Sequence, residues 1–250
     1  KADRPTTRAT VIMPAVHLPI GALVLAGIGS AGVAHRAFPL GASHGAIAAA
    51  MSLVDSADRE RPAERFDVAV VGGGTAGISI CAMLRARAPL LRVALVDPSE
   101  THSYQPEWSL VGANSYDAAD GRRAMESVIP VEVEWIRRPV LSFDPAADTL
   151  YLGSEPTSST TGAPASDSRL SYDRLVVCPG LEFDWRAMDG LAETLGANGV
   201  TSNYDYASSK YTAELVRSMP PGGRAVFTQP PGAIKCAGAP QKAMYLSSFD

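Results

Sequence analysis

The glycine-rich segment Gly72–Gly77 (GGGTAG) lies between two segments of different character, and it constrains the fold of this chain more than any other feature. Phe66–Val71 before it is apolar and rich in β-branched residues, which indicates a buried strand, whereas Ile78–Ala88 after it has the composition of a helix. A second apolar strand, Arg92–Val96, ends at Asp97. Strand, helix and strand within about 30 residues form the β-α-β unit from which parallel sheets are built.

The glycines fit the dinucleotide fingerprint G-x-G-x-x-G in its required context of strand and helix. Gly72 permits the tight turn, Gly74 lets the backbone approach a pyrophosphate, and Gly77 lets helix and strand pack closely. The alternative is a glycine-rich turn in a Rossmann domain that holds no nucleotide. The context favours a binding site.

Two further groups complete the expected site. The backbone amides of Thr75 and Ala76 would point at the phosphates from the positive end of the helix. Asp97 closes the second strand and would accept hydrogen bonds from the ribose hydroxyls.

A downstream element favours FAD over NAD as the dinucleotide. Ser171–Gly180 (SYDRLVVCPG) is similar to the [ST]-Y-D-x-L-V-x-A-x-G element that is typical of flavoproteins with two dinucleotide domains. In such proteins the glycine, here Gly180, leaves room for the flavin diphosphate. Cys178 occupies the alanine position, where we expect it to pack as a small apolar residue, with a redox role as the alternative.

The remaining pattern predicts an α/β fold. Further strands are expected at Val131–Ile136, Val140–Phe143, Thr149–Leu152 and Leu175–Val177, and a helix at Ala207–Met219. Residues 153–169 form a Ser/Thr/Gly/Pro tract that predicts an exposed hairpin loop. We therefore expect a Rossmann-like FAD-binding domain in residues 65–200, a parallel sheet with a β-meander insertion. Residues 201–250 would begin a second Rossmann-like domain.

Residues 1–64 are expected to be an N-terminal extension, because acidic residues are scarce before Asp55 and the segment from Ala9 to His35 has no formal charge. A mitochondrial-type presequence is the first interpretation, a non-coding leader before Met51 the second, and a membrane span the third. The chain starts at Lys1 and stops at Asp250, so we interpret it as a fragment.

The composition of the chain argues against several classes of function. The net charge is −4, from 22 basic and 26 acidic side chains, so no nucleic-acid partner is expected. Three cysteines are too few and too scattered for a disulfide scaffold, and three of the four histidines precede residue 50. The sequence therefore predicts no metal site.

The predicted strand at Arg224–Thr228 leads into QPPGAIKCAGAPQK and not into a second glycine fingerprint. NADH is thus not expected as the electron source. Cys236 stands there, beside Lys235 and shortly before a predicted helix near Gln241. A cation and a helix N-terminus both favour the thiolate over the thiol, so we expect Cys236 to be a nucleophile, with a structural loop cysteine as the alternative. Cys81, on the helix after the fingerprint, is expected to pack in the core.

The segment KCAGAPQK (235–242) resembles the sulfide:quinone oxidoreductases, closest to the mitochondrial type. The resemblance extends from Phe66 to Phe249 and also rests on Tyr104–Pro106 with Trp108, Leu110–Ala113, Ser127–Pro130, Glu134–Ile136 and Met244–Ser247.

The resemblance implies that Thr75, Ala76 and Asp97 bind FAD, that Gln105 lies near the cofactor, and that the backbone of Val140 meets the adenine. Cys236 would be one of two redox cysteines and would take up sulfide sulfur as a persulfide, the second cysteine lying downstream of this chain. The implied partners are hydrogen sulfide, ubiquinone, a small sulfur acceptor such as glutathione or sulfite, and a membrane surface. The implied location is the mitochondrial inner membrane, peripherally, and the 250 residues alone are expected to be inactive.

Two alternatives remain. A type II NADH:quinone dehydrogenase would share the first domain and the quinone, but it needs the second glycine motif. A non-catalytic FAD-binding fragment would bind the flavin without turnover. Bleaching of the flavin by NADH and not by sulfide would distinguish the first of these from a sulfide oxidoreductase.

Overall fold

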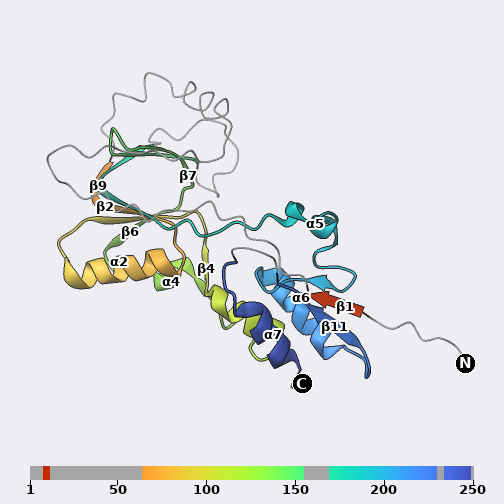
Figure 1. Ribbon diagram of the computed structural model, residues 1–250. Helices are drawn as coiled ribbons and strands as arrows, with labels where there is room; N and C mark the ends of the chain where they lie inside the picture. Colours follow the sequence, from red (N-terminus) through yellow and green to blue (C-terminus); the bar gives the residue numbers. More distant parts are fainter. Residues whose placement is uncertain (1–7, 12–63, 155–168, 230–233, 249–250) are drawn as a thin grey trace, which may run out of the picture. The chain divides into compact units, whose positions relative to one another are not determined.

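The computed structural model describes residues 8–11, 64–154, 169–229 and 234–248 (Figure 1). The chain divides into two compact units. We call Pro19–Glu100 with Met125–Pro179 the fingerprint unit, and Lys1–Leu18 with Thr101–Ala124 and Gly180–Asp250 the thiol unit.

The fingerprint unit contains a six-stranded sheet of order β6-β3-β2-β9-β8-β7. The first four strands are parallel, whereas β9, β8 and β7 pair in antiparallel fashion. The predicted α/β fold, a mostly parallel sheet with a β-meander, is thereby confirmed. The strands are β2 (Glu64–Val71), β3 (Val93–Val96), β6 (Val133–Ile136), β7 (Val140–Asp144), β8 (Thr149–Leu152) and β9 (Arg169–Val177).

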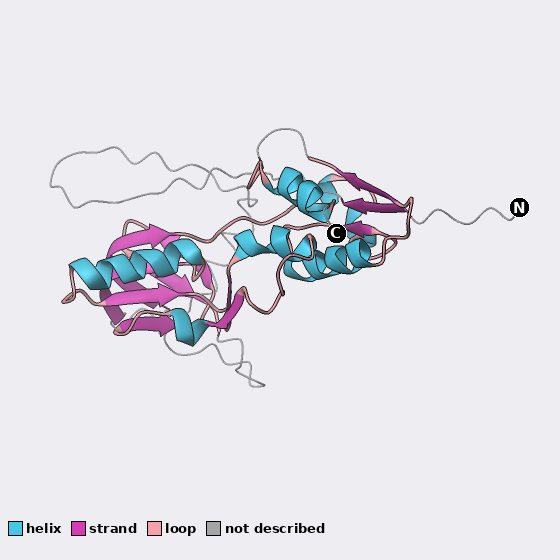
Figure 2. Ribbon diagram, turned by 90° about the horizontal axis from the view of Figure 1, so that it is seen from below, coloured by secondary structure: helices cyan, strands magenta, loops and turns pink. Residues whose placement is uncertain are grey.

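Helices and the meander cover opposite faces of the parallel strands. Helix α2 (Thr75–Arg87) lies across one face (Figure 2), where its Cys81 packs with apolar side chains such as Val70 and Leu95. On the other face, Leu150 and other meander residues pack against Phe66 and its neighbours. Burial on both faces explains why Val68–Val71 of β2 and the whole of β3 are continuous apolar runs and do not alternate. The short helix α4 (Met125–Val128) precedes β6.

The thiol unit contains a three-stranded parallel sheet of order β10-β1-β11. A second sheet is the antiparallel pair β4-β5. The strands are β1 (Arg8–Val11), β4 (Thr101–Ser103), β5 (Arg122–Ala124), β10 (Val200–Thr201) and β11 (Arg224–Phe227). The helices are the α-helices α3 (Trp108–Gly112), α5 (Leu191–Thr194), α6 (Tyr206–Arg217) and α7 (Ala239–Ser247) and the 3₁₀ helices η2 (Gln105–Glu107) and η3 (Trp185–Ala187).

Helix α6 connects β10 to β11, as in a β-α-β unit, and it matches the helix predicted at Ala207–Met219. Asp205 caps its N-terminus by accepting a hydrogen bond of 2.8 Å from the backbone N–H of Ser208. The sequence did not predict β1, which pairs with both β10 and β11. Its partners are far away along the chain, so no local pattern marks four residues as a strand.

Some predictions lie outside the described residues. These are the presequence, leader and span interpretations, which concern residues 1–64, of which the structure describes only 8–11 and 64, and most of the predicted hairpin loop, which falls on residues 155–168. Among the residues that the structure describes, no helix is both long enough and apolar enough to cross a membrane.

Candidate functional site

The fingerprint turn requires glycine at two positions. Gly72 has a φ of +101°, and a Cβ there would stand 2.1 Å from the carbonyl oxygen of Cys178. A Cβ at Gly77 would stand 1.9 Å from the carbonyl oxygen of Gly72. The turn after β2 and its packing against α2 therefore depend on the absence of these side chains.

Gly74 differs, because a Cβ there would meet no atom within 4 Å. It is the N-cap of α2, which no side chain caps and whose first turn contains no acidic residue. Thr75 and Ala76, the first two residues of the helix, are exposed. The N-terminus of α2 is therefore open to an anion, and the missing Cβ at Gly74 leaves room for it to approach the backbone.

Asp97 lies directly after β3, and two hydrogen bonds fix its carboxylate. One oxygen accepts from the backbone N–H of Gly73 at 2.6 Å, and the other accepts from that of Ser99 at 2.7 Å. The backbone carbonyl of Asp97 accepts from the indole N–H of Trp135 at 2.9 Å. Because each carboxylate oxygen can accept a second hydrogen bond, the carboxylate can still bind ribose hydroxyls.

These residues fit FAD: an uncapped helix N-terminus for the diphosphate, open space at Gly74, and a fixed acceptor at Asp97. Gly180, after β9, has a φ of +82°, and a Cβ there would meet nothing within 4 Å. Val140 is the first residue of β7, where it is half-buried and pairs with Leu152.

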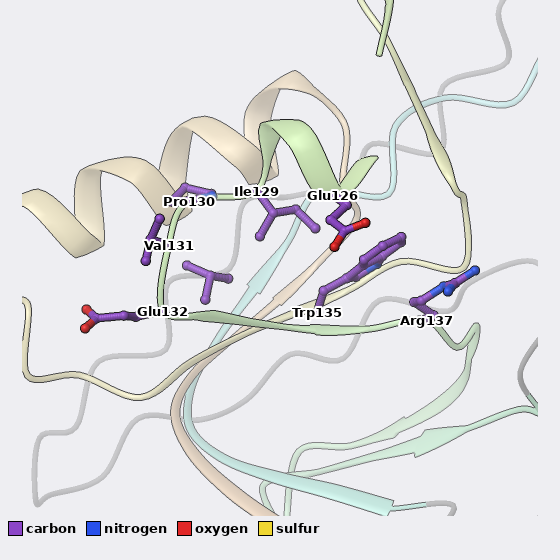
Figure 3. A pocket seen from close by; sticks show the side chains of 8 residues that line it. Glu126, Ile129, Pro130, Val131, Glu132, Trp135 and Arg137 are labelled. Carbon is purple, nitrogen blue, oxygen red and sulfur yellow. The ribbon is translucent and has the colours of Figure 1, made fainter. Parts of the chain in front are cut away.

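A separate hollow lies between α4 and β6 and includes none of the predicted site residues (Figure 3). Glu126 and Glu132 contribute carboxylates to its lining, and Trp135 of β6 lines it as well. Arg137, the one basic lining residue, pairs with Glu100. Two carboxylates disfavour a diphosphate, so this hollow is not a second phosphate site.

In the thiol unit, Cys236 is exposed in the loop before α7. Its backbone carbonyl accepts hydrogen bonds from the hydroxyl of Tyr204 at 2.9 Å and from the N–H of Ala239 at 3.1 Å. Burial, and to a lesser extent the Cys236 thiolate, raises the pKa of Tyr204. The loop backbone is thus anchored while the sulfur remains accessible.

Lys235 donates a hydrogen bond to the side-chain oxygen of Gln105. Burial lowers the pKa of the Lys235 ammonium, and the neighbouring Cys236 partly offsets this by raising it. Gln105, expected near the cofactor, is therefore close to the residue that precedes the thiol.

The other two cysteines have apolar surroundings. Cys81 is fully buried on α2, as the sequence predicted, and burial raises its pKa to about 12. Cys178 packs against the same cluster, and burial raises its pKa as well. Both thiols are therefore neutral near pH 7 and less reactive than a thiolate.

Three aromatic residues around Lys235 and Cys236 have no role among the predictions from the sequence. Trp108 and Phe183 lie near the Lys235 ammonium, and Tyr204 holds the Cys236 carbonyl. The segment SETHSYQPEWSLVGANSYD (99–117) contains more aromatic residues than a linker needs, and this was the available signal for Trp108.

Comparison with known proteins finds relatives that match almost three quarters of this chain. The curated sulfide:quinone oxidoreductase of Dictyostelium discoideum mitochondria is 37% identical over 180 residues, which cover 72% of this chain and 37% of that protein. The Mus musculus protein of the same name is 35% identical over 182 residues, covering 73% of this chain and 38% of that one. The matched part is therefore less than two fifths of either relative.

A solved structure of the sulfide:quinone oxidoreductase from Aquifex aeolicus is similar with a TM-score of 0.47 and 20% identity, over 63% of this chain and 32% of that one. The model of the pyridine nucleotide-disulphide oxidoreductase family matches residues 66–216, more than half of the chain. The chain therefore belongs to the pyridine nucleotide-disulphide oxidoreductase family, and like the relatives named above it is an FAD-dependent flavoprotein.

Proposed function

We propose that this chain is part of a flavoenzyme that oxidises sulfide at Cys236 and delivers the electrons through FAD to a quinone. The observation that carries the proposal is the exposed thiol of Cys236, which follows the Lys235 cation and precedes α7 within the segment KCAGAPQK. The names of the curated relatives supply the substrate class.

The proposed sulfur step begins with a disulfide between Cys236 and a second cysteine outside this chain. Hydrosulfide attacks the sulfur of Cys236, so that a new S–S bond forms and the old one breaks. Cys236 becomes a persulfide, and the second cysteine leaves as a thiolate with the electron pair. Both products carry an anionic sulfur near neutral pH, which a nearby cation stabilises.

The residues proposed to hold FAD are those predicted from the sequence: Gly72, Gly74, Thr75, Ala76, Gly77, Asp97, Gln105, Val140 and Gly180. FAD, when bound, supplies a two-electron acceptor that can pass electrons on to a quinone. The uncapped N-terminus of α2 supports binding of the diphosphate, and the carboxylate of Asp97 supports binding of the ribose.

We further propose ubiquinone as the electron acceptor, with glutathione or sulfite taking the sulfane sulfur. A peripheral position on the mitochondrial inner membrane is proposed as well, and the curated relatives are named as mitochondrial proteins.

The sulfur step can be tested on this chain without its second cysteine. Cys236 is first converted to a mixed disulfide with the chromogenic thiolate thionitrobenzoate, and the protein is then exposed to hydrosulfide. We expect release of the coloured thiolate, and peptide mass spectrometry should find one additional sulfur atom on Cys236. Recovery of only the free Cys236 thiol would mean that hydrosulfide attacks the other sulfur, which would overturn the proposal.

Cys236→Ser is the matched control and should release no thiolate under conditions that leave Cys81 and Cys178 unmodified. A second arm loads the protein with FAD and adds NADH. Bleaching of the flavin by NADH would instead favour an NADH:quinone dehydrogenase.

A further inference from the structure

We propose that Gln105, Trp108 and Phe183 form a clamp that holds the Lys235 ammonium beside Cys236 and thereby positions a positive charge for anionic sulfur. This inference rests on the proposed function, and it assigns positioning roles to side chains that the sulfur step does not itself name. We use "the clamp" for these three residues.

The ammonium of Lys235 has three neutral partners. It donates to the amide oxygen of Gln105, and it lies 5.5 Å from the ring centroid of Trp108 and 5.8 Å from that of Phe183. An amide oxygen and two aromatic faces attract a cation without cancelling its charge. A carboxylate partner would have cancelled it.

No ion pair within the described part of the chain includes Lys235. Its electrostatic partner is Cys236, the adjacent residue, which raises the pKa of the ammonium against the effect of burial. The positive charge is therefore available to a thiolate, a persulfide or an incoming hydrosulfide.

Phe183 also belongs to a cluster of three aromatic rings, with Trp185 and Tyr204, that holds the backbone of Cys236. The ring centroid of Phe183 lies 5.3 Å from that of Tyr204 and 5.4 Å from that of Trp185. Tyr204 in turn donates to the carbonyl of Cys236. Phe183 thus contacts both the cation and the tyrosine that anchors the thiol loop, so one cluster fixes both residues of the Lys235-Cys236 pair.

The test measures the charge that a reagent meets at the Cys236 sulfur. Iodoacetate is an anion and iodoacetamide is neutral, and both alkylate thiolates, so the ratio of their rates at Cys236 reports the local positive charge. Rates are followed by mass spectrometry of the peptide that contains Cys236, at low ionic strength, with the FAD-free 250-residue chain. We expect Lys235→Met to lower the ratio by about 10-fold, because the ammonium attracts the anionic reagent and not the neutral one.

The clamp variants keep Lys235 and change only what holds it. Trp108→Leu and Phe183→Leu should each lower the ratio by about 3-fold, whereas Trp108→Phe, which keeps an aromatic face, should restore most of it. Gln105→Glu is expected to lower the ratio because a carboxylate neutralises the ammonium in place. Gln105 is exposed and its position tolerates a charge, so this variant still tests the clamp if an aromatic variant fails to fold.

Lys210→Met is the matched control. Its ammonium lies 5.7 Å from the ring centroid of Tyr206, so it is a second lysine on an aromatic ring in the same unit. This variant should leave the ratio unchanged. An equal drop in Lys210→Met would show that overall charge, and not the clamp, determines the ratio.

The clamp is overturned if Lys235→Met lowers the ratio while Trp108→Leu, Phe183→Leu and Gln105→Glu all leave it at the native value. It is also overturned if Lys235→Met has no effect. The ratio is measured without sulfide, so its outcome is separate from that of the proposed function. A clamp-dependent ratio together with no persulfide on Cys236 would contradict the sulfide reaction and leave the clamp supported.

Discussion

The hydroxyl of Tyr204 donates a hydrogen bond of 2.9 Å to the backbone carbonyl of Cys236. Tyr204 follows strand β10, and Cys236 lies between β11 and α7. The bond therefore links the segment after β10 to the segment after β11, and both strands belong to the same parallel sheet. Because the acceptor is a backbone atom, the bond fixes the path of the loop and leaves the sulfur free to react.

Tyr204→Phe removes this donor and keeps the buried ring. We expect the free energy of unfolding to fall by about 1 kcal/mol, the usual net value of one hydrogen bond, and amide hydrogen exchange to speed up at Ala239. Chemical denaturation and exchange mass spectrometry measure the two effects. Tyr206→Phe serves as the control, because its ring keeps its contact with Arg122, 4.3 Å from the guanidinium. Similar losses in both variants would argue against a specific role of the Tyr204 bond.

Gly72→Ala and Gly74→Ala separate folding from cofactor binding. At Gly72 the new Cβ meets the Cys178 carbonyl and the φ is positive, so we expect a loss of about 2 kcal/mol or more in unfolding free energy. At Gly74 the new Cβ meets no protein atom, and we expect a change within about 0.5 kcal/mol. FAD affinity should nevertheless fall in Gly74→Ala, because the added methyl group occupies the approach to the helix N-terminus.

Thermal unfolding and flavin fluorescence titration measure these two properties. Unchanged FAD affinity in Gly74→Ala would show that the diphosphate does not approach the backbone at this position.

Gly112→Ala tests a tight contact in the thiol unit. A Cβ at Gly112 would stand 2.0 Å from the side-chain oxygen of Asn203, a residue that is only 3% exposed and so has little space into which to move. We expect a cost of about 1–3 kcal/mol in unfolding free energy, as for other overpacked core sites. The Asn203 amide has no hydrogen-bond partner among the described residues, so Asn203→Ala removes the clash at little polar cost.

A double-mutant cycle by urea denaturation checks this contact. The cost of Gly112→Ala should fall by at least about 1 kcal/mol in the Asn203→Ala background. Additive effects of the two substitutions would mean that the amide does not limit the space at Gly112.

The buried thiol of Cys81 should make the free energy of unfolding depend on pH. Burial raises its folded pKa from 9.0 to about 12, so above pH 9 the unfolded thiol loses its proton before the folded thiol does. The folded state then binds more protons than the unfolded state, and stability falls as pH rises between about 9 and 12. The expected slope is about 1.4 kcal/mol per pH unit for this one group.

Cys81→Ala removes this contribution, so its unfolding free energy should fall less steeply from pH 9 to pH 11 than that of the unmodified chain. Urea denaturation at a series of pH values gives both slopes. Parallel slopes would show that the Cys81 thiol ionises as easily in the folded state as in the unfolded state.

Local signals in the sequence predicted the turn, the helix and the strands of the fingerprint unit, whereas the sequence placed residues 101–124 and 180–200 in the same domain as these elements. The spacing of Gly72, Gly74 and Gly77 predicted the turn and the helix, and the apolar runs predicted the strands of a mostly parallel sheet. The structure agrees because each of these elements follows from steric rules within a few residues and from burial on both faces. The sequence also indicated Lys235 and Cys236 as a pair, since they are adjacent.

The surroundings of that pair, in contrast, depend on the folded arrangement of distant segments. Gln105 and Trp108 come from η2 and α3, and Phe183 comes from the segment before η3, and they meet Lys235 because these distant segments pack in one unit. Strand β1 is likewise identified only by its pairing with β10 and β11. Cation–π contacts and strand pairing between distant segments leave no periodicity in the sequence, because they depend on how the chain folds back on itself.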